Sequence, residues 1–272
     1  MQELIDRALK EDLGSGDLTS LAVVPENALA RARIEQKAPG VIAGLQAAES
    51  VFRRLDPELR WHAHVQEGEW RENGLVAEVA GSARWILAGE RVALNFLGHL
   101  SGIATLTARY VRAVEGTGAR ILDTRKTTPG LRALEKQAVL AGGGHNHRAG
   151  LFDAMLVKEN HSALGGGVGE ATRNAIAAAR EGVAVEIECA TLDEVDQALE
   201  AGAKSILLDN MTLEELREAA SRAKGRAETE ASGGVNLDTV RGIAETGVDW
   251  ISVGSLTHSA PALDLSLLLD PL

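Results

Sequence analysis

The sequence is poor in several features, and each shortage argues against a class of protein. Its single cysteine, Cys189, can form no disulfide within the chain and no cysteine cluster for a metal. No apolar run approaches the roughly 20 residues that a membrane-spanning helix needs. Residues 1–11 carry acids in an amphipathic pattern, which is unlike a secretion signal. We therefore expect a cytoplasmic protein that has no membrane segment.

Positive charge is also scarce, since 28 Lys and Arg stand against 39 Asp and Glu, for a net charge of -11. Such a surface repels phosphate backbones, so we expect no nucleic-acid partner. Any anionic substrate would have to be attracted by a local cationic pocket, against the field of the whole molecule.

The 272 residues suffice for one large domain or two modest ones, and the pattern changes near residue 100. Before that point, strand-like alternation at 32–36, 61–66 and 75–79 precedes a long helical stripe over 89–115. After residue 118, apolar strand-like runs alternate with helical segments. The strand-like runs are 120–123, 155–159, 184–189, 205–209, 228–232 and 250–254. The helical segments are 131–141, 168–181, 191–201, 212–223 and 236–246.

This alternation predicts right-handed βαβ units, hence an α/β fold with a parallel sheet. Six or more such units indicate a closed or open barrel instead of a doubly wound sheet. No G-x-G-x-x-G motif follows the first strand, which argues against a dinucleotide-binding fold.

Polar or small residues follow nearly every predicted strand, at the end that forms the catalytic face of a βα barrel. They are Asp123-Thr124-Arg125-Lys126, Lys158, Glu188, Asp209-Asn210, Ser232-Gly233-Gly234 and Gly254-Ser255. Strand parity places Glu186 and Glu188 on the face opposite Val185, Ile187 and Cys189, and it likewise sets Lys158 against Val157 and Asp209 against Leu208. If the apolar set packs on the outer helices, Lys158, Glu188 and Asp209 point into the barrel. Because buried charges without partners cost several kcal/mol, these groups must meet each other, a ligand or a metal.

Two motifs concentrate positive charge. Residues 123–132 read DTRKTTPGLR, and residues 142–148 read GGGHNHR. With Lys158, they bring Arg125, Lys126, His147 and Arg148 within reach of one pocket, which suits a small ligand with two carboxylates. The His145-Asn146-His147 spacing also resembles that of metal ligands, but the neighbouring Arg148 disfavours a bound cation.

Two glycine-containing loops are suited to binding a phosphate group. Ser232-Gly233-Gly234 and Gly254-Ser255-Leu256-Thr257-His258 follow the last two predicted strands, where such barrels commonly bind phosphate. Glu188 and Asp209 would then face vicinal hydroxyls, or Mg²⁺ carried in with a pyrophosphate.

These motifs resemble those of quinolinate phosphoribosyltransferase, also called nicotinate-nucleotide pyrophosphorylase (carboxylating). The resemblance covers nearly the whole chain and includes the segments 11–17, 123–130, 142–148, 158–161, 188–189, 208–210 and 232–234. It implies an N-terminal α/β sandwich at 1–105, to which residues 260–272 return, and an open (β/α) barrel of six or seven strands at 106–259. It also implies a homodimer or a hexamer built as a trimer of dimers, with active sites shared between subunits.

The resemblance further implies a reaction and a role for each site residue. The reaction joins quinolinate to phosphoribosyl pyrophosphate and yields nicotinate mononucleotide, pyrophosphate and carbon dioxide for NAD biosynthesis. The implied quinolinate pocket comprises Thr124, Arg125, Lys126, His147, Arg148, Lys158 and Arg91 from the neighbouring subunit. The implied phosphoribosyl pyrophosphate site comprises Glu188, Asp209, Ser232, Gly233, Gly234, Gly254 and His258. Catalysis falls to Lys126, Lys158, Glu188 and Asp209, the last two on the Mg²⁺ side.

Three other functions fit parts of the same pattern. Lys158 could form a Schiff base in a lyase, although the surrounding arginines and phosphate-type loops argue against it. A relative of the same fold could act on another acceptor, as the paralogues associated with molybdate transport do. A non-catalytic barrel would bind a ligand without turnover, but it has no need for charged strand ends all round.

Overall fold

The computed structural model describes all residues from 1 to 272 and divides into two compact units. The first unit contains residues 1–108, 129–143 and 259–272, and the second contains residues 109–128 and 144–258. None of the helices combines the length and the apolarity needed to cross a membrane.

The first unit is built on a four-stranded antiparallel sheet in the order β12-β1-β5-β3. These strands are β1 (Leu29–Gln36), β3 (Arg60–Ala63), β5 (Gly74–Ser82) and β12 (Leu265–Pro271). A two-stranded ribbon pairs β2 (Gly40–Val41) with β4 (Trp70–Arg71). The helices are α1 (Gln2–Leu13), α2 (Leu18–Val23), α3 (Leu45–Leu55), α5 (Arg132–Ala141) and most of α4 (Ala83–Ala113).

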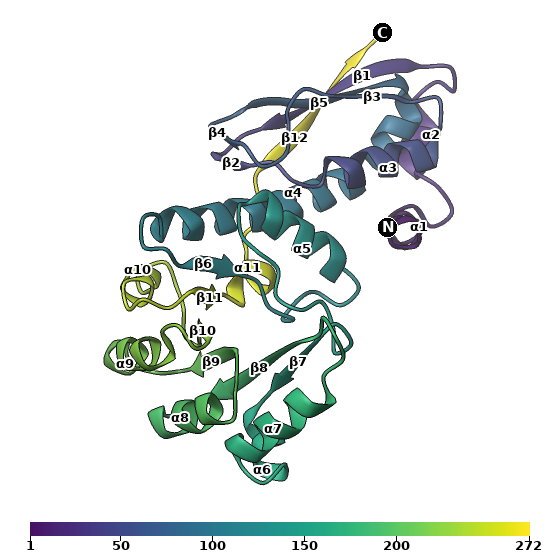
Figure 1. Cartoon of the computed structure of the whole chain (residues 1–272). Helices are drawn as coiled ribbons and strands as arrows, with labels where there is room; N and C mark the ends of the chain where they lie inside the picture. The colour runs from purple at the N-terminus through teal and green to yellow at the C-terminus, as the bar shows by residue number, and fades with distance from the viewer. The chain divides into compact units, whose positions relative to one another are not determined.

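Alternation along β1 creates the core of this unit. Ala32 and Ile34 are buried because they point to the face along which α3 lies (Figure 1). Phe52 of α3 is fully buried and stacks on Trp61 with 5.8 Å between the ring centroids. The apolar stripe of α4, including Leu97, completes the same core.

The second unit contains a six-stranded, wholly parallel sheet in the order β6-β11-β10-β9-β8-β7. The strands are β6 (Arg120–Leu122), β7 (Ala154–Val157), β8 (Ala184–Cys189), β9 (Ser205–Asp209), β10 (Glu228–Ser232) and β11 (Trp250–Ser252). The helices are α6 (Glu159–Leu164), α7 (Val168–Ala178), α8 (Leu192–Glu200), α9 (Leu213–Ala223), α10 (Val240–Ala244) and α11 (Ser255–His258).

This sheet is an open barrel, because the consecutive strands β6 and β7 lie at its two edges and do not pair with each other. His145 partly covers the β6 edge: its amide donates to the Ile121 carbonyl at 2.8 Å, and its carbonyl accepts from the Asp123 amide at 3.0 Å. The loop that follows His145 is thereby held at the carboxyl end of β6.

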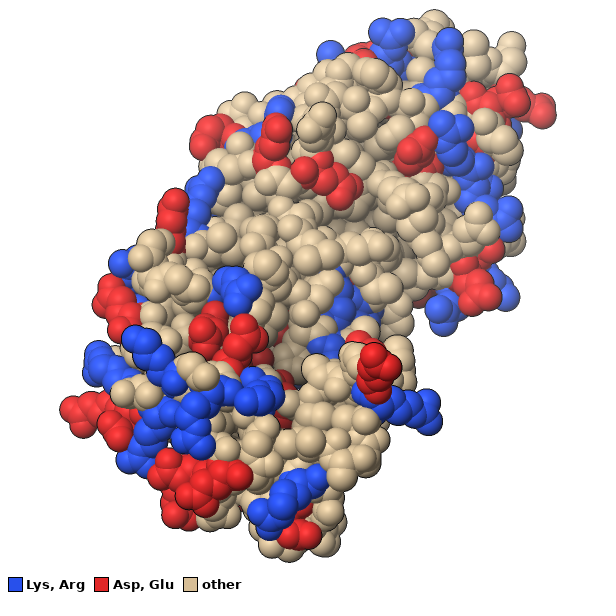
Figure 2. All heavy atoms as spheres, in the orientation of Figure 1, with Lys and Arg blue, Asp and Glu red and all other residues tan.

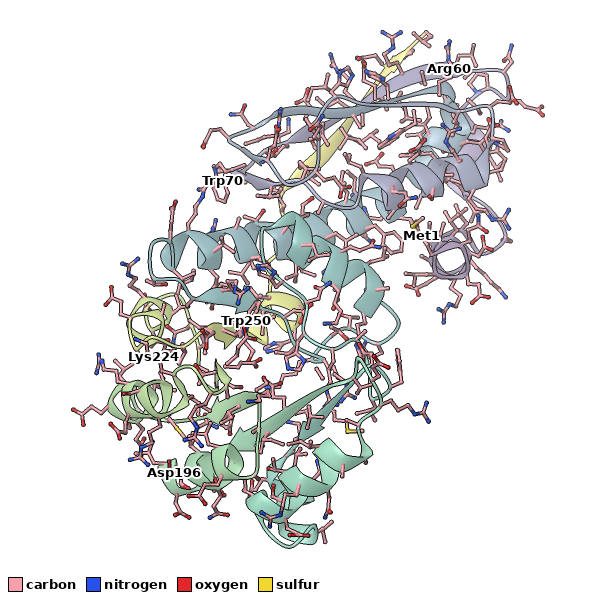
Figure 3. The ribbon with its side chains drawn as sticks, in the orientation of Figure 1. Met1, Arg60, Trp70, Asp196, Lys224 and Trp250 are labelled. Carbon is pink, nitrogen blue, oxygen red and sulfur yellow. The ribbon has the colours of Figure 1, made fainter.

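Helices cover the outer side of the strands, where Figure 1 shows α8, α9 and α10 in a row. Thr191 and Thr212 begin α8 and α9 with capping boxes, each closed by a glutamate three residues later. Figure 3 places Trp250 among the strands and places Asp196 and Lys224 on the outer helices. The predicted fold class, an N-terminal α/β sandwich domain followed by an open (β/α) barrel of six or seven parallel strands, is confirmed, and the barrel has six strands.

Several boundaries differ from the predicted segments, and two of them have local causes. The strand predicted over 155–159 ends at Val157, because Lys158 is the N-cap of α6 and His161 Nδ1 accepts the Lys158 amide at 3.0 Å. The helix predicted over 236–246 contains only Val240–Ala244, since Asn236 first forms a turn whose side chain accepts the Asp238 and Thr239 amides.

Candidate active site

Carboxylates gather at the carboxyl ends of β8 and β9. Glu159, Glu188, Glu194 and Asp209 all line one cavity of about 220 Å³. Glu194 is engaged elsewhere, because it accepts the Ala190 and Thr191 amides at the start of α8. Glu188 and Asp209 are half-buried and offer carboxylate oxygens to the cavity, which is the donor type that Mg²⁺ binds.

Lys158 supplies a positive charge beside this cavity. Its Nζ lies 3.1 Å from Glu188 Oε2, and the lysine side chain is 50% exposed. Lys158 is therefore ion-paired and in contact with water, whereas a Schiff-base lysine is typically desolvated in an apolar pocket. The geometry therefore favours an electrostatic role for Lys158.

Lys126, Gly254 and His258 form a second group, which joins two loops. The Thr257 hydroxyl donates to the Lys126 carbonyl at 2.7 Å. A Cβ at Gly254 would lie 3.1 Å from Lys126 Cδ and 3.3 Å from His258 Nε2. Only the absence of a side chain at Gly254 lets the Lys126 and His258 side chains approach the backbone so closely.

The Ser232-Gly233-Gly234 loop leaves β10 beside the end of β9. Both glycines have positive φ, 97° and 60°. Asn210, the one non-glycine residue with positive φ, donates its amide to the Ser232 carbonyl at 2.9 Å. Its side chain donates to Asp209 Oδ2 at 2.7 Å. The loop and the Asp209 carboxylate are thus positioned together.

Two arginines lie near each other on the remaining side. Burial is the main cause that lowers the pKa of the Arg148 guanidinium, and the neighbouring Arg125 charge lowers it further. Arg148 Nη1 also donates to the Ala154 carbonyl at 3.2 Å. Two guanidinium groups tolerate such proximity best when an anion lies between them.

Charge of both signs covers the drawn face of the molecule, and Figure 2 shows basic and acidic side chains interspersed over the outer helices α8 to α10. The net charge of -11 therefore does not produce a uniformly negative face there. The two arginines and two lysines of the site come from three separate loops.

Models of two families match this chain almost end to end. The N-terminal domain of quinolinate phosphoribosyl transferase matches residues 17–101, and the C-terminal domain of the same enzyme matches residues 103–268. The chain belongs to the quinolinate phosphoribosyltransferase family.

Relatives agree with this assignment over most of their length. A Bacillus subtilis protein named probable nicotinate-nucleotide pyrophosphorylase [carboxylating] is 41% identical over 98% of this chain and 92% of its own. The crystal structure of NadC from Streptococcus pyogenes is 41% identical, covers 100% of this chain and 96% of its own, and has a TM-score of 0.95. Nicotinate-nucleotide pyrophosphorylase from Francisella tularensis is 38% identical, with coverages of 98% and 95% and a TM-score of 0.95.

Arg91 is the one predicted site residue of this family member that belongs to the first unit. It is exposed on α4, on the same helical face as Asn95 and His99. His99 Nε2 lies 2.8 Å from Glu135 Oε1, so that histidine has a structural partner within its own unit.

Two buried glutamates were not among the predicted site residues. His147 Nε2 lies 2.8 Å from Glu186 Oε2 and 3.6 Å from Glu230 Oε2. Burial raises the pKa of Glu230 to about 7, and the Glu186 charge acts in the same direction. Strand parity placed Glu186 on the same face of its strand as Glu188. Glu230 alternates with Thr229 and Ala231 along β10, and all three are buried.

Proposed function

We propose that this chain catalyses the quinolinate phosphoribosyltransferase reaction, which yields nicotinate mononucleotide, pyrophosphate and carbon dioxide. One observation carries the proposal: a cationic group and a carboxylate-lined cavity meet through the 3.1 Å contact between Lys158 and Glu188. The cationic group suits two anionic reactants. The carboxylate-lined cavity suits a ribose with its metal-bound pyrophosphate.

The quinolinate side comprises Arg125, His147 and Arg148, together with Thr124, Lys126 and Lys158. Arginine forks bind carboxylates bidentately, so the pair Arg125 and Arg148 can fix a ring that carries two carboxylates. Fixing the ring directs its nitrogen at the ribose C1 and lowers the entropic part of the barrier.

The phosphoribosyl pyrophosphate side comprises Glu188, Asp209 and the two glycine loops. Ser232, Gly233 and Gly234 present backbone amides to the 5′-phosphate, and Gly254 and His258 approach it from the neighbouring loop. Glu188 and Asp209 hold the ribose hydroxyls and favour the positive charge that develops on the ring as pyrophosphate leaves.

Mg²⁺ fits the same residues, since Glu188 and Asp209 supply hard oxygen donors beside the cavity. When bound, it neutralises charge on the departing pyrophosphate. Lys126 and Lys158 add cationic side chains for that leaving group.

The ring nitrogen becomes cationic once it is bonded to the ribose carbon, and it then withdraws electrons from the adjacent carbon. The carboxylate on that carbon leaves as carbon dioxide, and a proton takes its place to give nicotinate mononucleotide. Loss of carbon dioxide therefore follows from the first step and needs no further protein nucleophile.

Assembly and location belong to the same proposal. Arg91 of the partner subunit would complete the quinolinate pocket, which requires at least a homodimer, and a trimer of dimers preserves the same shared sites. A cytoplasmic location is part of the same proposal.

A comparison of acceptors tests the proposal. Purified protein with Mg²⁺ and phosphoribosyl pyrophosphate receives either quinolinate or nicotinate, and nicotinate mononucleotide is quantified by chromatography. Product from quinolinate at least 100-fold faster than from nicotinate is expected, because nicotinate lacks one of the carboxylates that the arginines bind. Equal rates with the two acceptors, or no product from quinolinate, would reject the assignment.

A further inference from the structure

A line of hydrogen bonds runs from β9 through β8 to the loop that carries His147 and Arg148. The Ser205 hydroxyl donates to Glu186 Oε1 at 2.9 Å, and Glu186 Oε2 lies 2.8 Å from His147 Nε2. The Arg148 amide donates to His147 Nδ1 at 2.7 Å. Ser205 and Glu186 lie outside the cavity that Glu188 and Asp209 line.

The bond from Arg148 decides the protonation of the ring. Because Nδ1 accepts an amide hydrogen, it carries no proton of its own, and the proton of the neutral imidazole is on Nε2. Nε2–H then donates to Glu186. With both ring nitrogens occupied, His147 has no proton to offer the carbon that loses its carboxylate.

The same bonding argues against a metal at this cluster. Ligand atoms of His147, Glu186 and Glu230 lie within 4.8 Å of one another, as metal ligands would. A metal on Nε2 needs that nitrogen without its proton, which is incompatible with an amide hydrogen donated to Nδ1. The two carboxylates therefore hold the His147 ring, and the ring in turn accepts the Arg148 amide.

The backbone around this ring is held from several sides. The His147 amide donates to Asp123 Oδ1 at 2.8 Å, at the end of β6. The next amide, that of Arg148, is bound by the His147 ring. The direction in which the Arg148 side chain leaves the backbone thus depends on the orientation of one imidazole.

The burial of this cluster indicates a role beyond stability. Glu186 and Glu230 are 8% and 2% exposed, and Glu230 Oε1 is buried without a hydrogen-bond partner. Apolar residues of similar volume would usually be as stable or more stable at such positions. Local violations of packing rules of this kind concentrate at functional sites.

We propose that Glu186 is a positioning residue for the quinolinate site, which holds the His147 ring and thereby fixes the Arg148 guanidinium. The inference rests on the proposed function, since it assigns quinolinate to Arg148. It predicts that quinolinate binding depends on Glu186, whereas phosphoribosyl pyrophosphate binding does not.

Glu186→Ala and Glu186→Gln test this, with KM measured for each substrate and quinolinate binding measured by calorimetry. Glu186→Ala should raise the quinolinate KM and Kd roughly 10- to 100-fold, the usual cost of losing a hydrogen bond to a charged group. The KM for phosphoribosyl pyrophosphate should stay within about twofold. Glu186→Gln should restore quinolinate KM to within about fivefold of the wild type, because its amide can accept from His147 and donate to Ser205.

A double-mutant cycle separates positioning from general stability. In a His147→Ala background, Glu186→Ala should change the quinolinate KM less than about twofold, since the ring through which it acts is gone. An undiminished effect there, equal changes in both KM values, or a folded Glu186→Ala with wild-type quinolinate KM would overturn the proposal.

Ser205→Ala decides the matter if Glu186→Ala does not fold. This variant removes only the hydrogen bond from Ser205 to Glu186 Oε1. It should raise the quinolinate KM about two- to fivefold and leave the KM for phosphoribosyl pyrophosphate unchanged. No change in Ser205→Ala overturns the proposal. Wild-type enzyme that fails to convert quinolinate would instead reject the proposed function, so the two failures are distinguishable.

Discussion

Gly233→Ala should damage the phosphoribosyl pyrophosphate site through Asn210. A Cβ at Gly233 would lie 2.1 Å from Asn210 Oδ1 and 3.1 Å from the Asn210 amide nitrogen. The Asn210 side chain must swing away, which breaks its 2.7 Å bond to Asp209 Oδ2. The backbone φ of 97° adds strain, because residues with a Cβ rarely adopt it.

The magnitude follows from these two terms. Positive φ costs a non-glycine residue about 1–2 kcal/mol, and the lost bond to a carboxylate costs about 1.5–3 kcal/mol. We expect about 2.5–5 kcal/mol of destabilisation in Gly233→Ala. Gly234→Ala is the matched control, since its φ is 60° but its Cβ would meet no atom within 4 Å. That variant should lose only about 1–2 kcal/mol.

Two assays read the difference. Chemical unfolding followed by circular dichroism compares stabilities, and steady-state kinetics compares kcat/KM for phosphoribosyl pyrophosphate. Gly233→Ala should lower that kcat/KM at least 10-fold more than Gly234→Ala does, because only the former displaces the residue that holds Asp209. Indistinguishable stability and kinetics in the two variants would refute the link from loop to carboxylate.

Three further predictions concern charge, burial and assembly. Arg125→Ala should abolish quinolinate binding in calorimetry and leave phosphoribosyl pyrophosphate binding largely intact, and mixing it with an Arg91→Ala chain should restore activity. Loss of binding of both ligands, or no rescue despite subunit exchange, would argue against a carboxylate site shared between subunits. Because burial raises the pKa of Glu230 from 4.5 to about 7, the folded state keeps that proton and loses stability as pH rises through this window. Glu230→Gln should therefore flatten the fall in urea midpoint between about pH 4.5 and pH 7, and an unchanged slope would contradict the shift. Burial raises the pKa of the Cys189 thiol to about 12, so iodoacetamide should label this cysteine slowly in the native protein and readily in urea. Rapid labelling of the native protein would contradict this.

Local pattern was enough to locate the barrel strands and the residues at their ends. The run 205–209 coincides with β9, whose apolar centre is buried, and the run 184–189 coincides with β8, where apolar residues alternate with Glu186 and Glu188. Parity then pointed Lys158 and Glu188 to the inner face, and the two side chains are partners there.

Contacts between distant segments could not be read in the same way. β12 pairs with β1 across more than 200 residues, and nothing local in the segment 265–271 specifies that partner. Helix α3 was not predicted either, although its residues bury Phe52 against the sheet. Such elements are selected by the surface that they cover, which exists only once the fold is formed.

The site shows the same division. Residue types at strand ends were visible, but the partner of His147 depends on the register between β8 and β9, which brings Ser205 opposite Glu186. The left-handed conformation of Asn210 is another product of packing, since it arises where the ends of β9 and β10 are joined.

Stoichiometry with labelled quinolinate tests the central claim most directly. Quinolinate carrying ¹⁴C in the carboxylate adjacent to the ring nitrogen is incubated with the enzyme, Mg²⁺ and phosphoribosyl pyrophosphate. Released ¹⁴CO₂, pyrophosphate and nicotinate mononucleotide should appear in equal amounts, and none should form when either substrate is omitted. Pyrophosphate without ¹⁴CO₂, or label retained in the nucleotide, would contradict the coupling of ribosyl transfer to decarboxylation.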